Sequence, residues 1–154
     1  MSLVRNSLHG IVAALILVAF GLFGTTLLTR VGYLAVPGAI GAPYGLPGLR
    51  LWPLGETGWL LFLTDTVAAL LLVALVWRSG RGFWGVWGAF VLGAVLADGL
   101  RAVVASQVLH ASLGAYAAHV AGGVLTGLLW GLALGWLPAL ARLARPRTQA
   151  AATG

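Results

Sequence analysis

The stretch that decides the fold is Ala111–Leu140, ASLGAYAAHVAGGVLTGLLWGLALGWLPAL. It is long enough to cross a bilayer, because a membrane-spanning helix needs about 20 predominantly apolar residues. Small residues and one histidine recur in it at every fourth position: Ala115, His119, Gly123, Gly127, Gly131 and Gly135. On a helix these positions form one slowly drifting stripe, along which a neighbouring helix can pack backbone to backbone. We therefore expect His119 to face protein rather than lipid.

A second row of small residues lies in the preceding apolar segment. Its members, again four residues apart, are Gly85, Ala89, Gly93 and Ala97, and Arg101 stands at the next step. The two rows predict a tightly packed helical hairpin, joined by a turn at Ser106–Ser112. The glycines of both rows are the predicted helix-packing positions.

The composition excludes a water-soluble protein. Of 154 residues, 60% are apolar and 8% are charged, and the mean hydropathy is +1.00. That much apolar surface cannot be buried within one soluble domain, so the partner predicted first is the lipid bilayer. The chain has no cysteine, which excludes disulfides and thiolate metal sites. Its nine basic residues are all arginines, and most of them lie at the ends of apolar segments rather than on one soluble basic face, so no nucleic-acid partner is expected.

Four apolar segments have the length of transmembrane helices. They are predicted at about 8–28, 59–77, 83–105 and 113–137, with an outer loop at 29–58 and a cytoplasmic tail at 138–154. The loop is rich in glycine and proline and cannot be helical. The predicted fold is therefore a single all-α, polytopic membrane domain over residues 1–154, a four-transmembrane-helix bundle with an apolar outer loop.

The distribution of arginines predicts the orientation. Six of them fall on one side of the predicted bundle: Arg5, Arg78, Arg81, Arg142, Arg145 and Arg147. Because positively charged residues favour the cytoplasmic side, both termini are expected in the cytoplasm, in a multi-pass protein of the plasma (inner) membrane. The first apolar run is longer than the core of a signal peptide, so we expect it to be a retained span.

The outer loop is too apolar for an ordinary solvated linker. It carries Tyr33, Tyr44 and Trp52 among its prolines. One interpretation is an interfacial loop anchored by these aromatic side chains on the outer membrane surface. The other is a lid over the mouth of the bundle, or a docking surface for another membrane subunit.

Ionisable residues from three predicted helices lie at similar depths below the outer face. Asp65, Asp98 and His119 are each about 9–10 Å from the end of a helix, and Arg101 is about 6 Å from it, at 1.5 Å per residue. An isolated charge at that depth is costly, so these groups should pair or reach water. We expect Arg101 to pair with Asp98 or Asp65, and His119 to share a proton with the remaining carboxylate.

Four interpretations of this polar cluster stay open. It is a structural ion pair with a hydrogen-bonded histidine, or an outward-opening site for an ion, a proton or a small polar solute. The third is a metal site built from Asp65, Asp98 and His119, with or without His110, and the fourth is haem held by two histidines. No close ligand spacing such as His-x-x-x-His occurs, so neither a metal nor a cofactor is predicted.

The run Ala117–Gly127, AAHVAGGVLTG, resembles the helix that carries the catalytic histidine in rhomboid intramembrane proteases. That family also requires a Gly-x-Ser-Gly nucleophile. The nearest match, Gly38–Gly41, has Ile40 in place of the serine and lies in the proline-rich loop. Because a histidine without a nucleophile cannot perform this chemistry, no catalytic residue is predicted.

The function expected first is that of a non-enzymatic membrane component, either an accessory subunit of another membrane protein or a self-associating protein. The alternative is a small transporter or sensor that uses Asp65, Asp98, Arg101 and His119 as an outward-facing pocket. A membrane enzyme comes third.

Overall fold

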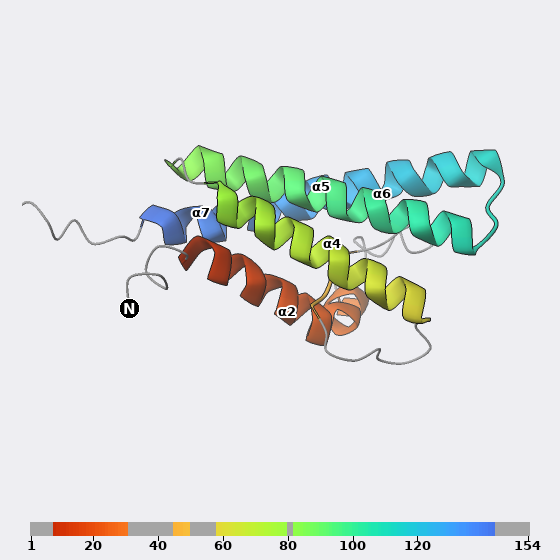
Figure 1. The fold of residues 1–154 in the computed structure, drawn as a ribbon, viewed down its shortest axis with the longest axis horizontal. Coiled ribbons are helices and arrows are strands. Elements are labelled where there is room, and N and C mark those ends of the chain that lie inside the picture. The colour runs from red at the N-terminus through yellow and green to blue at the C-terminus, as the bar shows by residue number, and fades with distance from the viewer. Residues whose placement is uncertain (1–7, 31–44, 50–57, 80–81, 144–154) are drawn as a thin grey trace, which may run out of the picture.

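The structure is a computed structural model that describes residues 8–30, 45–49, 58–79 and 82–143, the side chains of 24–30 excepted. Apart from 45–49 and short turns, these residues are helical and include no strand. The helices are α2 (Leu8–Arg30), α4 (Trp59–Arg78), α5 (Gly82–Val108), α6 (Leu113–Leu134) and α7 (Trp136–Leu143) (Figure 1).

Three of the described stretches are long and apolar enough to cross a membrane. They are Trp59–Arg78, Gly82–Val108 and Leu113–Leu143, the last of which joins α6 and α7. Leu8–Phe23 within α2 is a shorter apolar helix. The predicted all-α, four-helix membrane bundle is therefore confirmed.

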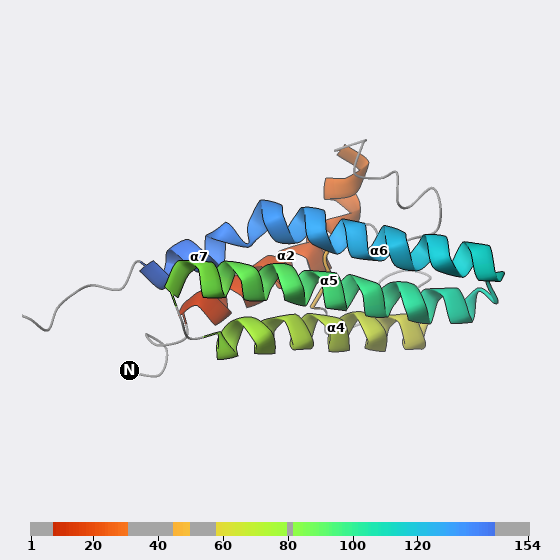
Figure 2. The same ribbon diagram turned by 90° about the horizontal axis from the view of Figure 1, so that it is seen from above.

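Helix α5 is the central helix of the bundle. It packs against α4, α6 and α7, while α2 packs against α4 and α7. Figure 1 shows α5 and α6 as neighbouring arms of a hairpin, and Figure 2 shows α5 between α4 and α6. In both views this hairpin reaches beyond the first residue of α4. Its outer end therefore projects past the rest of the described helices.

The final apolar segment differs from its prediction at its end. Helix α6 ends at Leu134, Gly135 forms a turn, and α7 continues to Leu143. The cause is Pro138, which has no backbone N–H and whose ring collides with the carbonyl group four residues earlier, that of Leu134. Residues 138–143 are thus helical rather than part of the predicted tail 138–154. The rest of that tail lies outside the described residues.

Along the middle of α5, leucines face outward and small side chains face inward. On α5, Gly93, Ala94 and Ala97 are buried, whereas Leu92 and Leu96 are exposed. This distribution is the reverse of that in a soluble domain, where leucine is among the most buried residues. It fits a bundle surrounded by hydrocarbon, in which close helix packing depends on small side chains.

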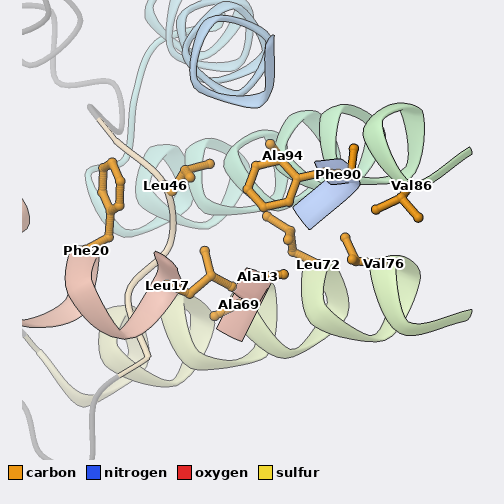
Figure 3. Packing of buried hydrophobic residues seen from close by; sticks show 11 residues of the cluster. Ala13, Leu17, Phe20, Leu46, Ala69, Leu72, Val76, Val86, Phe90 and Ala94 are labelled. Atoms are coloured by element: carbon orange, nitrogen blue, oxygen red, sulfur yellow. The ribbon is translucent and has the colours of Figure 1, made fainter. Parts of the chain in front are cut away.

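A cluster of larger apolar side chains fills the space between α2, α4 and α5. Leu17 of α2, Leu72 and Val76 of α4 and Phe90 of α5 belong to it (Figure 3). A separate edge-to-face contact joins Phe20 of α2 to Trp130 of α6, with ring centroids 4.9 Å apart. These contacts bring α2 against the hairpin.

Residues 45–49 form a non-helical strap inside the bundle. Gly45, Pro47 and Gly48 are buried, and Leu46, 3% exposed, joins the apolar cluster beside Phe20 (Figure 3). The described part of the predicted outer loop therefore enters the bundle instead of lying on the membrane surface. Tyr33, Tyr44 and Trp52, which the sequence predicts to be interfacial anchors, lie outside the described residues.

Candidate functional site

The candidate site is an ion cluster that joins α4 to α5. The Arg101 guanidinium lies between two carboxylates, with Nε 2.6 Å from Asp65 Oδ1 and Nη1 2.7 Å from Asp98 Oδ1. Asp98 and Arg101 are three residues apart on α5 and so share one face of that helix. Arg101 therefore pairs with both of the acids considered for it.

The strap closes this cluster through its backbone. The amide of Gly48 donates a hydrogen bond to Asp65 Oδ2 at 3.0 Å, and Arg101 Nη1 donates one to the carbonyl oxygen of Gly45 at 2.5 Å. The amide of Leu49 donates to the carbonyl oxygen of Leu17 on α2 at 3.0 Å. Non-helical backbone at membrane depth must have its polar groups satisfied by protein. The ion cluster provides hydrogen-bond partners for two backbone groups of the strap, the Gly48 amide and the Gly45 carbonyl.

The three charged side chains differ in exposure. Asp98 is fully buried, whereas the side chains of Asp65 and Arg101 are 13% and 21% exposed. Asp98 thus lies deepest in the protein, and the side chains of Asp65 and Arg101 lie nearer the protein surface.

His119 does not join the carboxylates as predicted. Its Nδ1 lies 3.1 Å from Oγ of Ser106 on α5, and both side chains are buried. The predicted depths assume that the third span ends at residue 105, but α5 continues to Val108. Asp98 is consequently ten residues from the end of α5, about 15 Å, whereas His119 is six residues from the start of α6, about 9 Å. Gly123, one turn after His119 on α6, lies against the Asp98 carbonyl group, so His119 lies about one turn away from Asp98, beside Ser106.

The hydrogen bonds around Ser106 assign the proton positions. Its Oγ donates to the carbonyl oxygen of Ala102 at 2.7 Å, and a hydroxyl group has one proton to give. Ser106 Oγ must then accept a hydrogen bond from the N–H at Nδ1 of His119. In a nucleophilic dyad the serine donates to the histidine, so this arrangement is the reverse of the one that activates serine.

The residues considered for metal or haem binding do not meet. His110 lies in the exposed turn after α5, and His119 is buried against Ser106. Within the described ranges, no three histidine, aspartate or glutamate side chains stand close enough together to hold a metal ion.

Three glycines of α6, Gly123, Gly127 and Gly131, lie directly on the backbone of α5. A Cβ atom added to Gly123 would be 2.7 Å from the carbonyl oxygen of Asp98, and one added to Gly131 would be 2.9 Å from the Cα of Val91. At Gly127 the added atom would collide with the Ala94 carbonyl group. Gly135 differs, because it forms the turn before α7 and lies against Trp87 and Phe90 of α5.

The two glycines of the predicted row on α5 differ in their surroundings. Gly93 packs against Leu72 of α4, whereas Gly85 is exposed. Four residues turn a helix through about 400°, so a row spaced by four drifts by about 40° at each step. Gly85 is two steps from Gly93 and therefore points about 80° away from it around the helix axis. The row of α5 that faces inward starts one residue later, at Val86.

Comparison with known proteins identifies no relative. No protein-family model, no curated protein and no solved structure matches this chain. The candidate function therefore depends on the geometry of the described residues.

That geometry is suited to holding segments together. Each described polar contact in the half of the bundle that contains the ion cluster either joins two segments or satisfies backbone groups. The ion cluster ties α4, α5 and the strap, and the pair of Ser106 and His119 ties α5 to α6. Sequence reasoning assigned Ser106 to the turn and so missed it. Its spacing of four residues from Ala102, which continues the Asp98 row, is the signal that could have identified it.

We expect Ser106→Ala to destabilise the folded protein by about 1 kcal/mol, because the imidazole N–H of His119 loses its acceptor. The measurement is equilibrium unfolding in mixed micelles. Thr126→Val is the matched control, since Thr126 is also buried and its hydroxyl bonds only within α6, to the Gly122 carbonyl. Equal destabilisation by the two substitutions would show that the contact between α5 and α6 contributes nothing.

Proposed function

We propose that this protein is a non-enzymatic accessory subunit of the plasma (inner) membrane. The observation that supports this most strongly is the internal use of the outer polar groups. Arg101 binds both Asp65 and Asp98 and also the strap, and His119 binds Ser106. A catalytic site would instead keep an activated nucleophile or an open polar position toward its substrate.

An accessory role is favoured over self-association through the glycine stripe. Gly123, Gly127 and Gly131 already lie against α5 of the same chain, so they are not accessible to a second copy. The exposed apolar surface is instead formed by large side chains, such as Leu63 and Leu70 on α4. We propose that a partner membrane protein, like lipid, contacts the protein through such outward faces.

The proposed orientation has both termini in the cytoplasm. It rests on the positive-inside rule, with Arg78 and Arg81 between α4 and α5 and further arginines at the two ends of the chain. The ion cluster would then lie in the outer half of the membrane, near the start of α4.

The test combines purification with transport assays. The chain has a mass of 15.9 kDa, and we expect it to be recovered from its native membrane, in mild detergent, within a larger complex of fixed composition. Purified alone into proteoliposomes, it should carry no flux of protons or alkali ions. A protein recovered as a single chain, with a flux that Asp98→Asn abolishes, would contradict the accessory role.

The second candidate is a small transporter or sensor with an outward-facing polar site. One observation favours it: among the described residues the ion cluster contains two carboxylates and one guanidinium, whose charges do not balance. The same flux assay separates this candidate from the first.

A further inference from the structure

Among the residues that the structure describes, the ion cluster carries one negative charge more than its contacts compensate. The single positive charge of Arg101 is shared between Asp65 and Asp98. Within the described ranges, no second cationic side chain lies at ion-pair distance from either carboxylate. A net charge among helices surrounded by hydrocarbon is costly, and proteins compensate it with a partner of opposite sign.

One carboxylate oxygen of the cluster has neither a hydrogen bond nor an ion pair. Asp98 Oδ1 receives Arg101, whereas Asp98 Oδ2 is buried and has no hydrogen-bond partner. Asp65 Oδ1 also makes no hydrogen bond, but it lies in an ion pair 2.6 Å from Arg101 Nε, and Asp65 Oδ2 accepts a hydrogen bond from the Gly48 amide. An ionised carboxylate has two oxygens that accept hydrogen bonds or bind cations. The excess charge and the vacant oxygen therefore coincide at Asp98.

Other titratable groups near this carboxylate do not account for the imbalance. On α4 and α5 the groups that face it are Asp65 and Arg101, which belong to the cluster, and the strap contributes none. On α6 the titratable side chains are Tyr116 and His119, and the imidazole of His119 is hydrogen-bonded to Ser106. His9 of α2 lies at the other end of the bundle, next to the glycine that packs on Trp77 at the end of α4.

We infer that the cluster of Asp65, Arg101 and Asp98 binds one monovalent cation, a proton or an alkali ion, at Oδ2 of Asp98. Such a cation restores neutrality and occupies the cluster oxygen that has neither a hydrogen bond nor an ion pair. The cation would approach from the side of Asp65 and Arg101, because their side chains are partly exposed and the side chain of Asp98 is fully buried. The inference does not depend on the accessory role, because the cation can serve as a permanent counter-ion or as cargo.

The test is the melting temperature of the purified protein in detergent. One series varies pH from 5 to 8 in choline chloride, and the other adds sodium or potassium chloride at pH 8 and constant ionic strength. A ligand at a hundredfold excess over its dissociation constant should raise the melting temperature by roughly 5–10 °C. A rise on acidification alone identifies the proton, and a rise on adding salt at fixed pH identifies an alkali ion.

Two variants connect the response to the cluster. Asp98→Asn removes the proposed ligand oxygen, and Asp65→Asn leaves one carboxylate to balance one guanidinium, so both should lose the response. If Asp98→Asn does not fold, Asp65→Asn still provides the test. His119→Gln is the control and should keep the response. A wild-type protein whose melting temperature depends on neither cation, or a full response in Asp65→Asn, would overturn the inference.

Discussion

Replacing Gly127 with alanine is expected to cause one of the largest losses of stability that a single added methyl group can produce in this protein. The new Cβ would overlap the backbone of α5 at Ala94 and Val95, and backbone atoms cannot move aside as the end of a side chain can. Overpacking of this kind costs about 3 kcal/mol. The measurement is the free energy of unfolding in mixed micelles, together with the yield of monodisperse protein.

Two other glycines provide matched controls for this prediction. A Cβ atom added to Gly88 on α5 or to Gly114 on α6 would meet nothing within 4 Å. Since alanine favours helix over glycine by about 1 kcal/mol, Gly88→Ala and Gly114→Ala should leave stability unchanged or increase it slightly. Should Gly127→Ala be as stable as these controls, α5 and α6 do not approach each other as described.

The second large effect is expected for Arg101→Met. This substitution leaves Asp65 and Asp98 without their shared cation and removes the donor to the Gly45 carbonyl. Breaking a buried ion pair by removing one partner costs about 3–5 kcal/mol, because the remaining charge is buried without compensation. We expect little folded protein at the growth temperature, measured as the fraction recovered as a single peak in gel filtration.

A combined variant separates loss of charge balance from loss of packing. The substitutions Asp65→Asn and Asp98→Asn, added to Arg101→Met, remove all three charges while keeping side chains of similar size. Neutral replacement of a buried ion cluster is often tolerated, so most of the lost folded yield should return. If the triple variant folds no better than Arg101→Met alone, uncompensated charge is not the cause of the defect.

The helices and the pairing within the ion cluster were accessible from sequence because lipid imposes strict requirements. Apolar segments of about 20 residues must be helical in hydrocarbon, and charges within them must find partners. Those requirements place Asp65, Asp98 and Arg101 together without any knowledge of loop structure. They also place the glycines of the 113–137 segment toward a neighbouring helix.

Other features depend on distances that hydropathy does not reveal. A helix end misplaced by three residues moves a side chain by about 4.5 Å, enough to give His119 the wrong partner. The exposure of Gly85 follows from the drift of a row spaced by four, which turns Gly85 about 80° away from Gly93. The burial of the strap depends on backbone hydrogen bonds of Gly48 and Leu49, which the pattern of side chains in the sequence does not predict.

The central claim, that an ion cluster holds the strap inside the bundle, is tested most directly by the reaction rate of a cysteine at position 46. The chain has no native cysteine, so Leu46→Cys and His110→Cys each provide one reactive thiol. In detergent, a water-soluble maleimide should label the exposed position 110 rapidly and the buried position 46 at least tenfold more slowly. Equal labelling rates at the two positions would show that the strap lies outside the bundle and would contradict the account.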